Sequence, residues 1–271
     1  MERKIGFIGC GNMGAALIRG IVGSKLVPAP DIHVFDVDRA KLAALQEETG
    51  IQVAKGNREV VENSDIIILA IKPNLLSTVL EPVKDAFGEN KVLVSILAGI
   101  PIKSFKNIIG ENARIIRTMP NTPALIGEGM TLLSSGDTVS EQETADVRSL
   151  FECVGKTEML DEKLMNEVIA LTSSSPAYVF MFIEAMADAA VLSGIPRALA
   201  YRLAAQAVQG SAKMVLETGK HPGELKDQVC SPGGTTIEAV YTLEKNGFRH
   251  GVMEAMNDCT RKAREMGRLF G

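Results

Sequence analysis

Short runs of apolar residues alternate with segments of helical pattern through the first half of the chain. The runs are rich in β-branched residues and hardly interrupted by polar ones, as in strands that are buried on both faces of a sheet. They occupy residues 4–9, 31–36, 65–71, 91–97 and 113–119, with a weaker run at 51–54. Helical segments separate them, such as residues 38–50, which end at a glycine. This alternation predicts an α/β fold, with a doubly wound parallel sheet that has helices on both faces.

The pattern changes in the second half. Residues 129–136 predict one more strand, at the edge of the sheet, and residues 140–153 predict a helix. From Asp161 onward the apolar positions follow helical spacing, and no strand is predicted. We therefore expect an α/β domain over residues 1–160 and an all-α domain over residues 161–271.

One predicted helix, residues 176–192, is apolar on nearly all sides. Its only charged residues are Glu184 and Asp188. A surface helix of a soluble domain has one apolar stripe, whereas a helix that is apolar all round must be covered on all sides. The segment is slightly short for a membrane-spanning helix, and it carries two charges. The helical domain could bury one such helix by itself, but burial against a second subunit explains it at least as well, so we favour an obligate homodimer.

Composition and charge narrow the class of protein. Of the 271 residues, 46% are hydrophobic and 23% are charged, which is typical of a folded, soluble protein. The net charge is −4 and no basic stripe occurs, so we expect neither nucleic acid nor a membrane as a partner. The 4 cysteines and 3 histidines are far apart and lack metal-binding spacing. We therefore expect no bound metal. Because the N-terminus does not have the pattern of a signal peptide, we also expect a cytoplasmic protein.

A glycine motif follows the first predicted strand directly. Gly9, Gly11 and Gly14 have the spacing G-x-G-x-x-G and stand at the start of the first predicted helix. In a Rossmann fold the first glycine permits a tight turn, the second lets a pyrophosphate approach the backbone, and the third lets helix and strand pack closely. Free N–H groups at the helix N-terminus attract the phosphates. The motif and the βαβ pattern around it predict a Rossmann domain that binds a dinucleotide.

The second predicted strand ends at an acidic residue, Asp36, 22 residues after Gly14. An acid at this place binds the ribose 2′-hydroxyl of NAD and repels the 2′-phosphate of NADP. Arg39 lies three residues further on and offers a partner to such a phosphate. Asp36 favours NADH, but the loop by itself leaves the choice of cofactor open.

Ligands of a doubly wound sheet lie at the carboxyl ends of its strands. Three of the predicted strands end in small residues or prolines, at residues 70–73, 96–99 and 118–123. Such residues keep the backbone open and close to a ligand. Lys72 is the one charged side chain among them, and it is either a cofactor contact or a solvated surface lysine.

The sequence offers no convincing acid or base for catalysis. His33 lies in a predicted strand, His221 precedes a proline, and His250 lies in a late helix. Reduction of a carbonyl needs a proton for the oxygen, whereas a cyclic imine can enter already protonated. The protein then has to supply mainly position and a hydride donor. The chain therefore favours a substrate that brings its own proton.

Residues 231–236, SPGGTT, precede a predicted helix of the second domain. Thr235 and Glu238 have the spacing of a capping box, S/T-x-x-E, which would start that helix. The box does not explain the two glycines, which cost chain entropy unless the backbone must approach something closely. Backbone N–H groups at the helix start, with the hydroxyls of Ser231, Thr235 and Thr236, can hold a carboxylate. We predict that the segment is both a helix cap and an anion site.

These motifs together resemble the pyrroline-5-carboxylate reductase family. The matching segments span essentially the whole chain in the expected order: IGFIGCGNMGAALI, AIKP, MPNTP, SPAYVFMFIEAMADAAVLSGIPRALA and VCSPGGTTIEAVYTLEKNGFRHGV. The last segment is diagnostic of that family, whereas many dehydrogenases share the first. The resemblance implies reduction of L-1-pyrroline-5-carboxylate to L-proline by NAD(P)H, with NADPH the commoner donor. It also implies a Rossmann domain followed by a helical dimerisation domain, in dimers that often assemble into decamers of five dimers.

The resemblance also implies roles for single residues. The segment from Ile8 to Met13 holds the pyrophosphate, and Asn57 and residues 70–73 lie along the cofactor. Thr236 lies at the imine nitrogen as the catalytic residue. The helical domains of such enzymes interlock, so this loop can complete the partner subunit's site. The expected substrate contacts are Ser231, Gly233, Gly234, Thr235 and Thr236. The expected cofactor contacts are Ile8, Gly9, Cys10, Gly11, Asn12, Met13, Gly14, Asp36, Asn57, Ala70, Ile71, Lys72, Pro73, Leu97, Ala98 and Gly99.

Two features depart from the family, and two other functions stay open. TSSSP replaces a Ser-Gly-Ser-Gly type turn before the long apolar helix, and Asp36 stands where strict NADP users often carry a small or neutral residue. An oxidoreductase of the β-hydroxyacid dehydrogenase type would need a catalytic lysine in that helix start, and residues 173–185 contain none. A non-catalytic dinucleotide sensor would have no use for a carboxylate site in the second domain.

Overall fold

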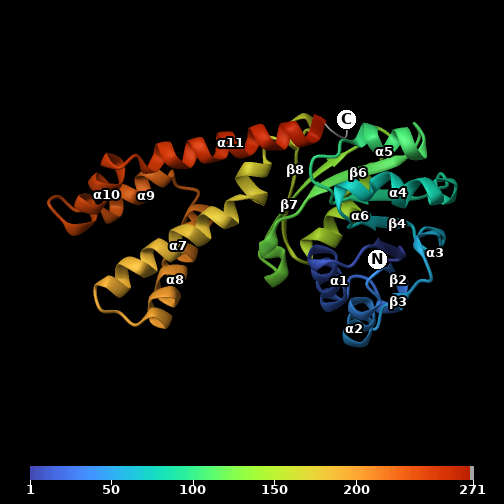
Figure 1. Cartoon of the computed structure of the whole chain (residues 1–271), viewed down its shortest axis with the longest axis horizontal. Helices are drawn as coiled ribbons and strands as arrows, with labels where there is room; N and C mark the ends of the chain where they lie inside the picture. Colours follow the sequence, from blue (N-terminus) through green and yellow to red (C-terminus); the bar gives the residue numbers. More distant parts are fainter. Residues whose placement is uncertain (269–271) are drawn as a thin grey trace. The chain divides into compact units, whose positions relative to one another are not determined.

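The computed structural model describes residues 1–268 and divides the chain into two compact units (Figure 1). The first unit contains residues 1–173 together with the described residues from Cys259 onward, and the second contains Ser174–Asp258. The first has mixed α/β structure and the second is helical, which confirms the predicted fold class. A 3₁₀ turn, Glu162–Leu164, and a π-helical turn, Ile169–Ser173, lie between the last strand and the helical unit.

Eight strands form one sheet in the order β3-β2-β1-β4-β5-β6-β7-β8. The strand order reverses beside β1, since Ile5 pairs with Ile32 of β2 on one side and with Ile66 of β4 on the other. Ligands of doubly wound sheets bind at such a switch point. The strands are β1 (Ile5–Ile8), β2 (Ile32–Phe35), β3 (Gln52–Val53), β4 (Ile66–Leu69), β5 (Val92–Ser95), β6 (Arg114–Met119), β7 (Gly129–Ser135) and β8 (Gly155–Met159).

The sheet is parallel except for one pair near its end. β7 runs antiparallel to β6, with Thr118 opposite Leu133, and β8 runs parallel to β7. The expectation that residues 129–136 form an edge strand is therefore wrong, because β8 covers that edge. The sequence does not predict β8, since Lys156, Glu158 and Met159 are exposed and give no apolar run.

Helices cover both faces of the sheet, in two separate apolar layers (Figure 1). The first layer contains side chains such as Leu17, Leu42 and Phe151 from α1 (Asn12–Ser24), α2 (Arg39–Thr49) and α6 (Glu141–Glu152). The second contains side chains such as Val60, Leu80 and Phe105 from α3 (Asn57–Glu62), α4 (Leu76–Leu80) and α5 (Ile102–Ile109). Because the central strands are buried on both faces, they need the continuous apolar runs seen in the sequence.

The helical unit contains α7 (Ser175–Leu192), α8 (Arg197–Thr218), α9 (Pro222–Val229), α10 (Thr235–Lys245) and the first part of α11 (Phe248–Arg268). Within this unit the fully buried apolar side chains are small ones: Ala187, Ala200 and Ala204. Many large apolar side chains are exposed instead, among them Phe180, Met181, Leu192, Leu203, Leu216, Tyr241 and Met253. A unit with so small a core needs a cover for this surface, as the predicted homodimer would provide.

One helical stretch, Ile169–Leu192, is long and apolar enough to cross a membrane by length and composition. It has 24 residues, and a window of 18 residues within it has a mean hydropathy of 1.4. The expectation that this helix is too short for a span is therefore wrong, because the π-helical turn lengthens it. A single such helix is weak evidence for a membrane, and its exposed apolar side chains equally suit a subunit interface.

Candidate active site

The three glycines of the motif meet different surroundings. Gly9 has φ +98°, and a Cβ there would lie 2.4 Å from the carbonyl oxygen of Ala70. A Cβ on Gly14 would lie 2.7 Å from the carbonyl oxygen of Gly9. At Gly11, by contrast, a Cβ would meet no atom of the described residues within 4 Å. The chain therefore packs closely against Gly9 and Gly14, whereas the space beside Gly11 is open. A ligand has room to approach the backbone there.

The N-terminus of α1 is free to bind an anion. Gly11 is the N-cap residue, and no side chain of residues 1–268 caps it. The first N–H groups of the helix therefore point outward without a side-chain partner. Beside the turn lies a cavity of about 240 Å³, lined by Cys10, Gly11, Asn12, Ala15, Arg19, Lys41, Ala44, Leu45 and Leu125. The open glycine and the uncapped helix fit the pyrophosphate of a dinucleotide.

Asp36 is held rigidly against this turn. One carboxylate oxygen accepts a hydrogen bond from the Cys10 N–H at 2.6 Å, and the other accepts one from the Asp38 N–H at 2.8 Å. Burial above all, together with the charge of Asp36 and its hydrogen bond, raises the pKa of the Cys10 thiol to about 12, so the thiol is neutral and unreactive at physiological pH. The two hydrogen bonds therefore fix the orientation of the Asp36 carboxylate beside the glycine turn.

Arg39 lies on the other side of the same loop. Its guanidinium stands 4.8 Å from the ring centroid of Phe35, and its Nη2 donates to the carbonyl oxygen of Lys55 at 3.5 Å. Lys55 comes two residues before Asn57, where α3 begins. The strand end of β2 and the start of α3 therefore share one edge, which brings Asp36, Arg39 and Asn57 into the same part of the fold.

The remaining predicted cofactor residues follow β4 and β5 at the carboxyl edge. The Ala70 N–H donates to the carbonyl oxygen of Ile8 at 2.8 Å, so the segment Ala70–Pro73 starts beside the glycine turn. The Leu97 N–H donates to Ser95 Oγ at 3.1 Å, and Gly99 has φ +81°. Lys72 is exposed at the start of a 3₁₀ turn. The structure thus brings all predicted cofactor segments to one edge of the sheet, while their roles stay predictions.

The start of α10 differs from the expected capping box. The chain turns at Ser231–Gly234, where Gly233 has φ +66° and the Gly234 N–H donates to the Ser231 carbonyl oxygen at 3.0 Å. This turn brings the chain into the helix one residue earlier, so Gly234 is the N-cap and Thr235 is the first helical residue. The capping box of Thr235 and Glu238 is therefore wrong, because Thr235 lies inside the helix and not at its cap.

Without that box, the donors at the start of α10 are available. No side chain in the described part of the chain caps this helix. The Ser231 Oγ lies beside the Gly234 Cα, where a Cβ would approach it to 2.4 Å, so a larger residue at position 234 would force the Ser231 hydroxyl to turn away. The Thr235 side chain is exposed and that of Thr236 is half-buried. Three hydroxyls and a free helix N-terminus are thus gathered around one turn, as an anion site requires.

The histidines stand apart from both motifs. His33 lies in β2 and its pKa is lowered, chiefly by burial. His221 caps α9, since its Nδ1 accepts from the Gly223 N–H at 3.1 Å. Among the described residues no group of three His, Cys, Asp or Glu side chains could hold a metal ion. The geometry thus supplies anion-binding N–H groups and hydroxyls rather than an acid–base pair.

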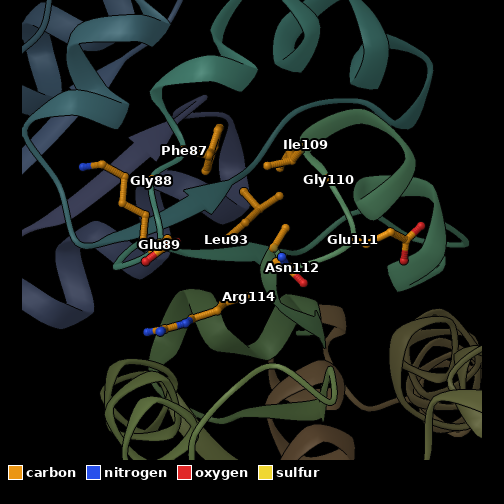
Figure 2. A pocket seen from close by; sticks show the side chains of 11 residues that line it. Phe87, Gly88, Glu89, Leu93, Ile109, Gly110, Glu111, Asn112 and Arg114 are labelled. Atoms are coloured by element: carbon orange, nitrogen blue, oxygen red, sulfur yellow. The ribbon is translucent and has the colours of Figure 1, made fainter.

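A second cavity, of about 260 Å³, lies at the amino ends of β5 and β6 (Figure 2). Phe87, Leu93 and Ile109 lie together around it. Its cations have partners: Lys91 Nζ donates to the carbonyl oxygens of residues 61, 62 and 64, and Arg114 pairs with Glu143 at 2.7 Å. Because this cavity lies at the edge opposite to the glycine turn, it is not the candidate site.

The sequence patterns did not single out one cluster near the carboxyl edge, built around a buried arginine. Arg117 in β6 contacts Glu162 and Asn166, which lie in the same unit. A visible signal exists, because Arg117 follows two isoleucines inside the strand, and a charged side chain is rarely buried without a partner.

Comparisons with known proteins bear on both units. Residues 162–266 match the family model described as pyrroline-5-carboxylate reductase dimerisation, and residues 4–99 match the model described as NADP oxidoreductase coenzyme F420-dependent. The pyrroline-5-carboxylate reductase of Escherichia coli is 50% identical over 268 residues, which are 99% of this chain and 100% of that protein.

Solved structures agree with this match over nearly the full length. The pyrroline carboxylate reductase of Plasmodium falciparum, with NADP bound, superposes with a TM-score of 0.89 at 33% identity, covering 98% of each chain. The pyrroline-5-carboxylate reductase of Coxiella burnetii superposes with a TM-score of 0.92 at 31% identity, covering 98% of this chain and 99% of that one. The similarity therefore includes both units and both candidate motifs.

Proposed function

The chain belongs to the pyrroline-5-carboxylate reductase family, and we propose that it reduces L-1-pyrroline-5-carboxylate to L-proline with a reduced nicotinamide dinucleotide. Family membership leaves no support for the two other functions, a β-hydroxyacid dehydrogenase or a non-catalytic sensor. The proposal is also supported by the chemistry of the chain, which offers two anion sites and few candidates for acid–base catalysis.

The observation that carries the proposal is the uncapped start of α10. Its N–H groups and the Ser231 and Thr235 hydroxyls would hold the carboxylate of the substrate, and the Thr236 hydroxyl would lie at the imine nitrogen. Gly233 and Gly234 let the ring approach the backbone. We assign Thr236 as the catalytic residue, since it alone of these groups would contact the reacting C=N bond.

The reaction needs few steps from the protein. A bound reduced nicotinamide supplies the hydride. The imine would enter as its protonated iminium, and addition of a hydride at the carbon of the C=N bond would give the neutral amine. Residues of the chain would bind the imine, orient it toward the hydride donor and exclude water from the site. Positioning of this kind is the main contribution that the protein makes to such a step. No residue has to deliver a proton during the transfer.

We propose NADPH as the donor, with NADH accepted as well. The uncapped α1 and Gly11 would bind the pyrophosphate of either cofactor. Arg39 and Lys41 supply positive charge near a 2′-phosphate, whereas Asp36 and Asp38 supply negative charge at the same loop. We infer that the fixed Asp36 carboxylate weakens the preference for NADPH that many members of the family show.

We further propose that the helical domain, residues 161–271, joins two chains in a homodimer, that five dimers form a decamer, and that the enzyme is cytoplasmic. Supporting the dimer are the match to a dimerisation domain and the exposed apolar surface of α7. Light scattering distinguishes twice from ten times the chain mass of 29.0 kDa. A monomer in solution would refute the assembly.

The test of the function is a spectrophotometric assay of NADPH and NADH oxidation with pyrroline-5-carboxylate. We expect substrate-dependent oxidation and formation of proline. An assembled, folded enzyme that oxidises neither cofactor in the presence of the imine would refute the proposal.

A further inference from the structure

Arg117 is a buried cation inside the sheet. It lies in β6, opposite Ser95 of β5 and Ser134 of β7, two residues before the carboxyl end of the strand. Only 2% of its side chain is exposed. Burial of a charged group costs much solvation free energy, so a buried arginine normally has a full set of partners.

The partners of Arg117 satisfy it only in part. Its Nη2 donates to Asn166 Oδ1 at 2.6 Å, and its Nη1 lies 3.6 Å from Glu162 Oε1. Its Nε is buried and has no hydrogen-bond partner among the described residues. Replacing a buried ionic cluster by apolar side chains of similar volume is often neutral or stabilising, so stability alone does not account for this arginine.

The two partners connect Arg117 to the start of α5 and to the end of α11. Glu162 Oε1 also accepts a hydrogen bond from the Ile102 N–H at 2.6 Å, at the first residue of α5. Asn166 lies so close to Gly267 of α11 that a Cβ there would come within 2.8 Å of its Nδ2. The same Cβ would lie 3.4 Å from the carbonyl oxygen of Gly99. Both connections therefore converge on the segment that runs from β5 to α5.

That segment carries predicted cofactor contacts. Leu97, Ala98 and Gly99 follow β5, and Ile102, the first residue of α5, comes three residues after Gly99. In a doubly wound sheet the two halves of a dinucleotide bind on the two sides of the switch point. The pyrophosphate turn follows β1 and Asp36 follows β2, so the segment after β5 lies on the nicotinamide side.

We propose that Arg117 is a positioning residue for hydride transfer, which holds the Leu97–Ile102 segment in place through Glu162 and Asn166. The proposal rests on the proposed function of the chain. Arg117 is buried beneath the segment and acts through its neighbours, not on the substrate. Its loss should therefore affect the geometry of the reacting groups more than the binding of the cofactor.

The first test is Arg117→Met, which keeps an unbranched side chain as long as the aliphatic stem of arginine and removes the guanidinium with its charge. We expect kcat to fall by about tenfold, because small displacements of reacting groups are costly. The dissociation constant of the dinucleotide, measured by nicotinamide fluorescence without substrate, should rise by less than about threefold, since the pyrophosphate contacts are unchanged. Amide hydrogen exchange of residues 96–104 should be faster than in the wild type.

Arg114→Met is the matched control. Arg114 lies in the same strand, at its amino end, and pairs with the buried Glu143 at 2.7 Å. This variant loses the same charge and an ion pair at the other end of the strand. We expect lower stability in urea but unchanged kcat and unchanged exchange of residues 96–104.

Two further variants keep the test decisive. Glu162→Gln retains an acceptor for the Ile102 N–H and removes the negative charge beside Arg117. If the residues act as a unit, Arg117→Met/Glu162→Gln should lower kcat no further than Arg117→Met alone. Arg117→Lys reaches only one of the two partners; it should show the same changes to a smaller extent, and it replaces Arg117→Met if that variant does not fold.

The results separate the two proposals. Wild-type kcat per folded molecule and unchanged exchange in Arg117→Met would overturn the positioning role, as would an equal loss of kcat in Arg114→Met. If the wild type does not reduce the imine, the proposed function fails. The exchange comparison between Arg117→Met and Arg114→Met then still decides whether Arg117 holds the segment.

Discussion

Replacement of Asp36 by serine should shift the cofactor preference toward NADPH. Both oxygens of the carboxylate accept backbone hydrogen bonds, from the N–H groups of Cys10 and Asp38 at 2.6 and 2.8 Å. A carboxylate held in this way cannot turn aside for a 2′-phosphate on the ribose. The carboxylate readily accepts hydrogen bonds from the ribose hydroxyls of NADH, and it repels the doubly charged 2′-phosphate of NADPH. Its removal should therefore favour NADPH.

The magnitude follows from charge and exposure. Two unit charges about 5 Å apart interact with about 3 kcal/mol at an effective dielectric constant near 20. Asp36 is half-buried, so salt and water reduce this to about 1–2 kcal/mol. Since about 1.4 kcal/mol corresponds to a factor of ten, the ratio of kcat/KM for NADPH to that for NADH should rise about 5- to 30-fold.

The assay measures kcat/KM for both cofactors with pyrroline-5-carboxylate at saturating concentration. Loss of the two accepted hydrogen bonds should also lower the free energy of unfolding by about 1–2 kcal/mol, which urea titration measures separately. Asp38→Ser is the control, because it removes a carboxylate two residues away and still provides a hydroxyl that can cap the Lys41 N–H.

An unchanged cofactor ratio in Asp36→Ser would refute the reasoning, since the carboxylate then does not face the ribose. An equal shift in Asp38→Ser would show that the general charge of the loop, and not the fixed direction of Asp36, sets the preference.

Three other variants test the substrate site, the interface and the electrostatics. Thr236→Ala should lower kcat/KM for the imine by about tenfold and leave the dinucleotide dissociation constant unchanged, and unchanged kinetics would remove its assigned role. Phe180→Glu, at a side chain 64% exposed, should give monomers in sedimentation at micromolar concentration, whereas Lys213→Glu should not. Burial alone would raise the pKa of Glu143, but hydrogen bonds from Ser140 and Arg114 hold it below 4.5. The wild type should therefore have a higher free energy of unfolding than Glu143→Gln above about pH 5, and this difference should shrink as the pH falls further. Urea titrations at several pH values measure it.

Most of the fold follows from local pattern, and the exceptions have local causes. The strands β1, β4 and β5 are buried on both faces, so each appears as a continuous apolar run. β8 is covered mainly on one side and has a single buried residue, Thr157, so its sequence resembles a loop. Its existence depends on pairing with β7, which is a tertiary contact and leaves no periodic signal.

The candidate site was predictable where backbone conformation restricts the residue type. Gly9 and Gly14 stand where a Cβ would collide with a backbone carbonyl oxygen, and glycine at such positions is visible in the sequence. The exact start of α10 was not predictable, because the turn at Gly233 and not the S/T-x-x-E spacing decides which residue caps it. The contacts of Arg117 were equally hidden, since Glu162 and Asn166 lie 45 and 49 residues away from it in sequence.

The two proposed anion sites would explain how the chain can manage without an acid–base pair. The α1 start is uncapped beside an open glycine, and the α10 start is uncapped beside three hydroxyls. Glycine is the N-cap residue of both helices, and a glycine in place of a capping side chain costs only roughly a few tenths of a kcal/mol, so the two starts cost the fold little. Their free N–H groups would be satisfied when a phosphate or a carboxylate binds. An iminium that carries its own proton then needs only to be held beside a hydride donor, and a catalyst built from helix starts and positioning residues is sufficient for that reaction.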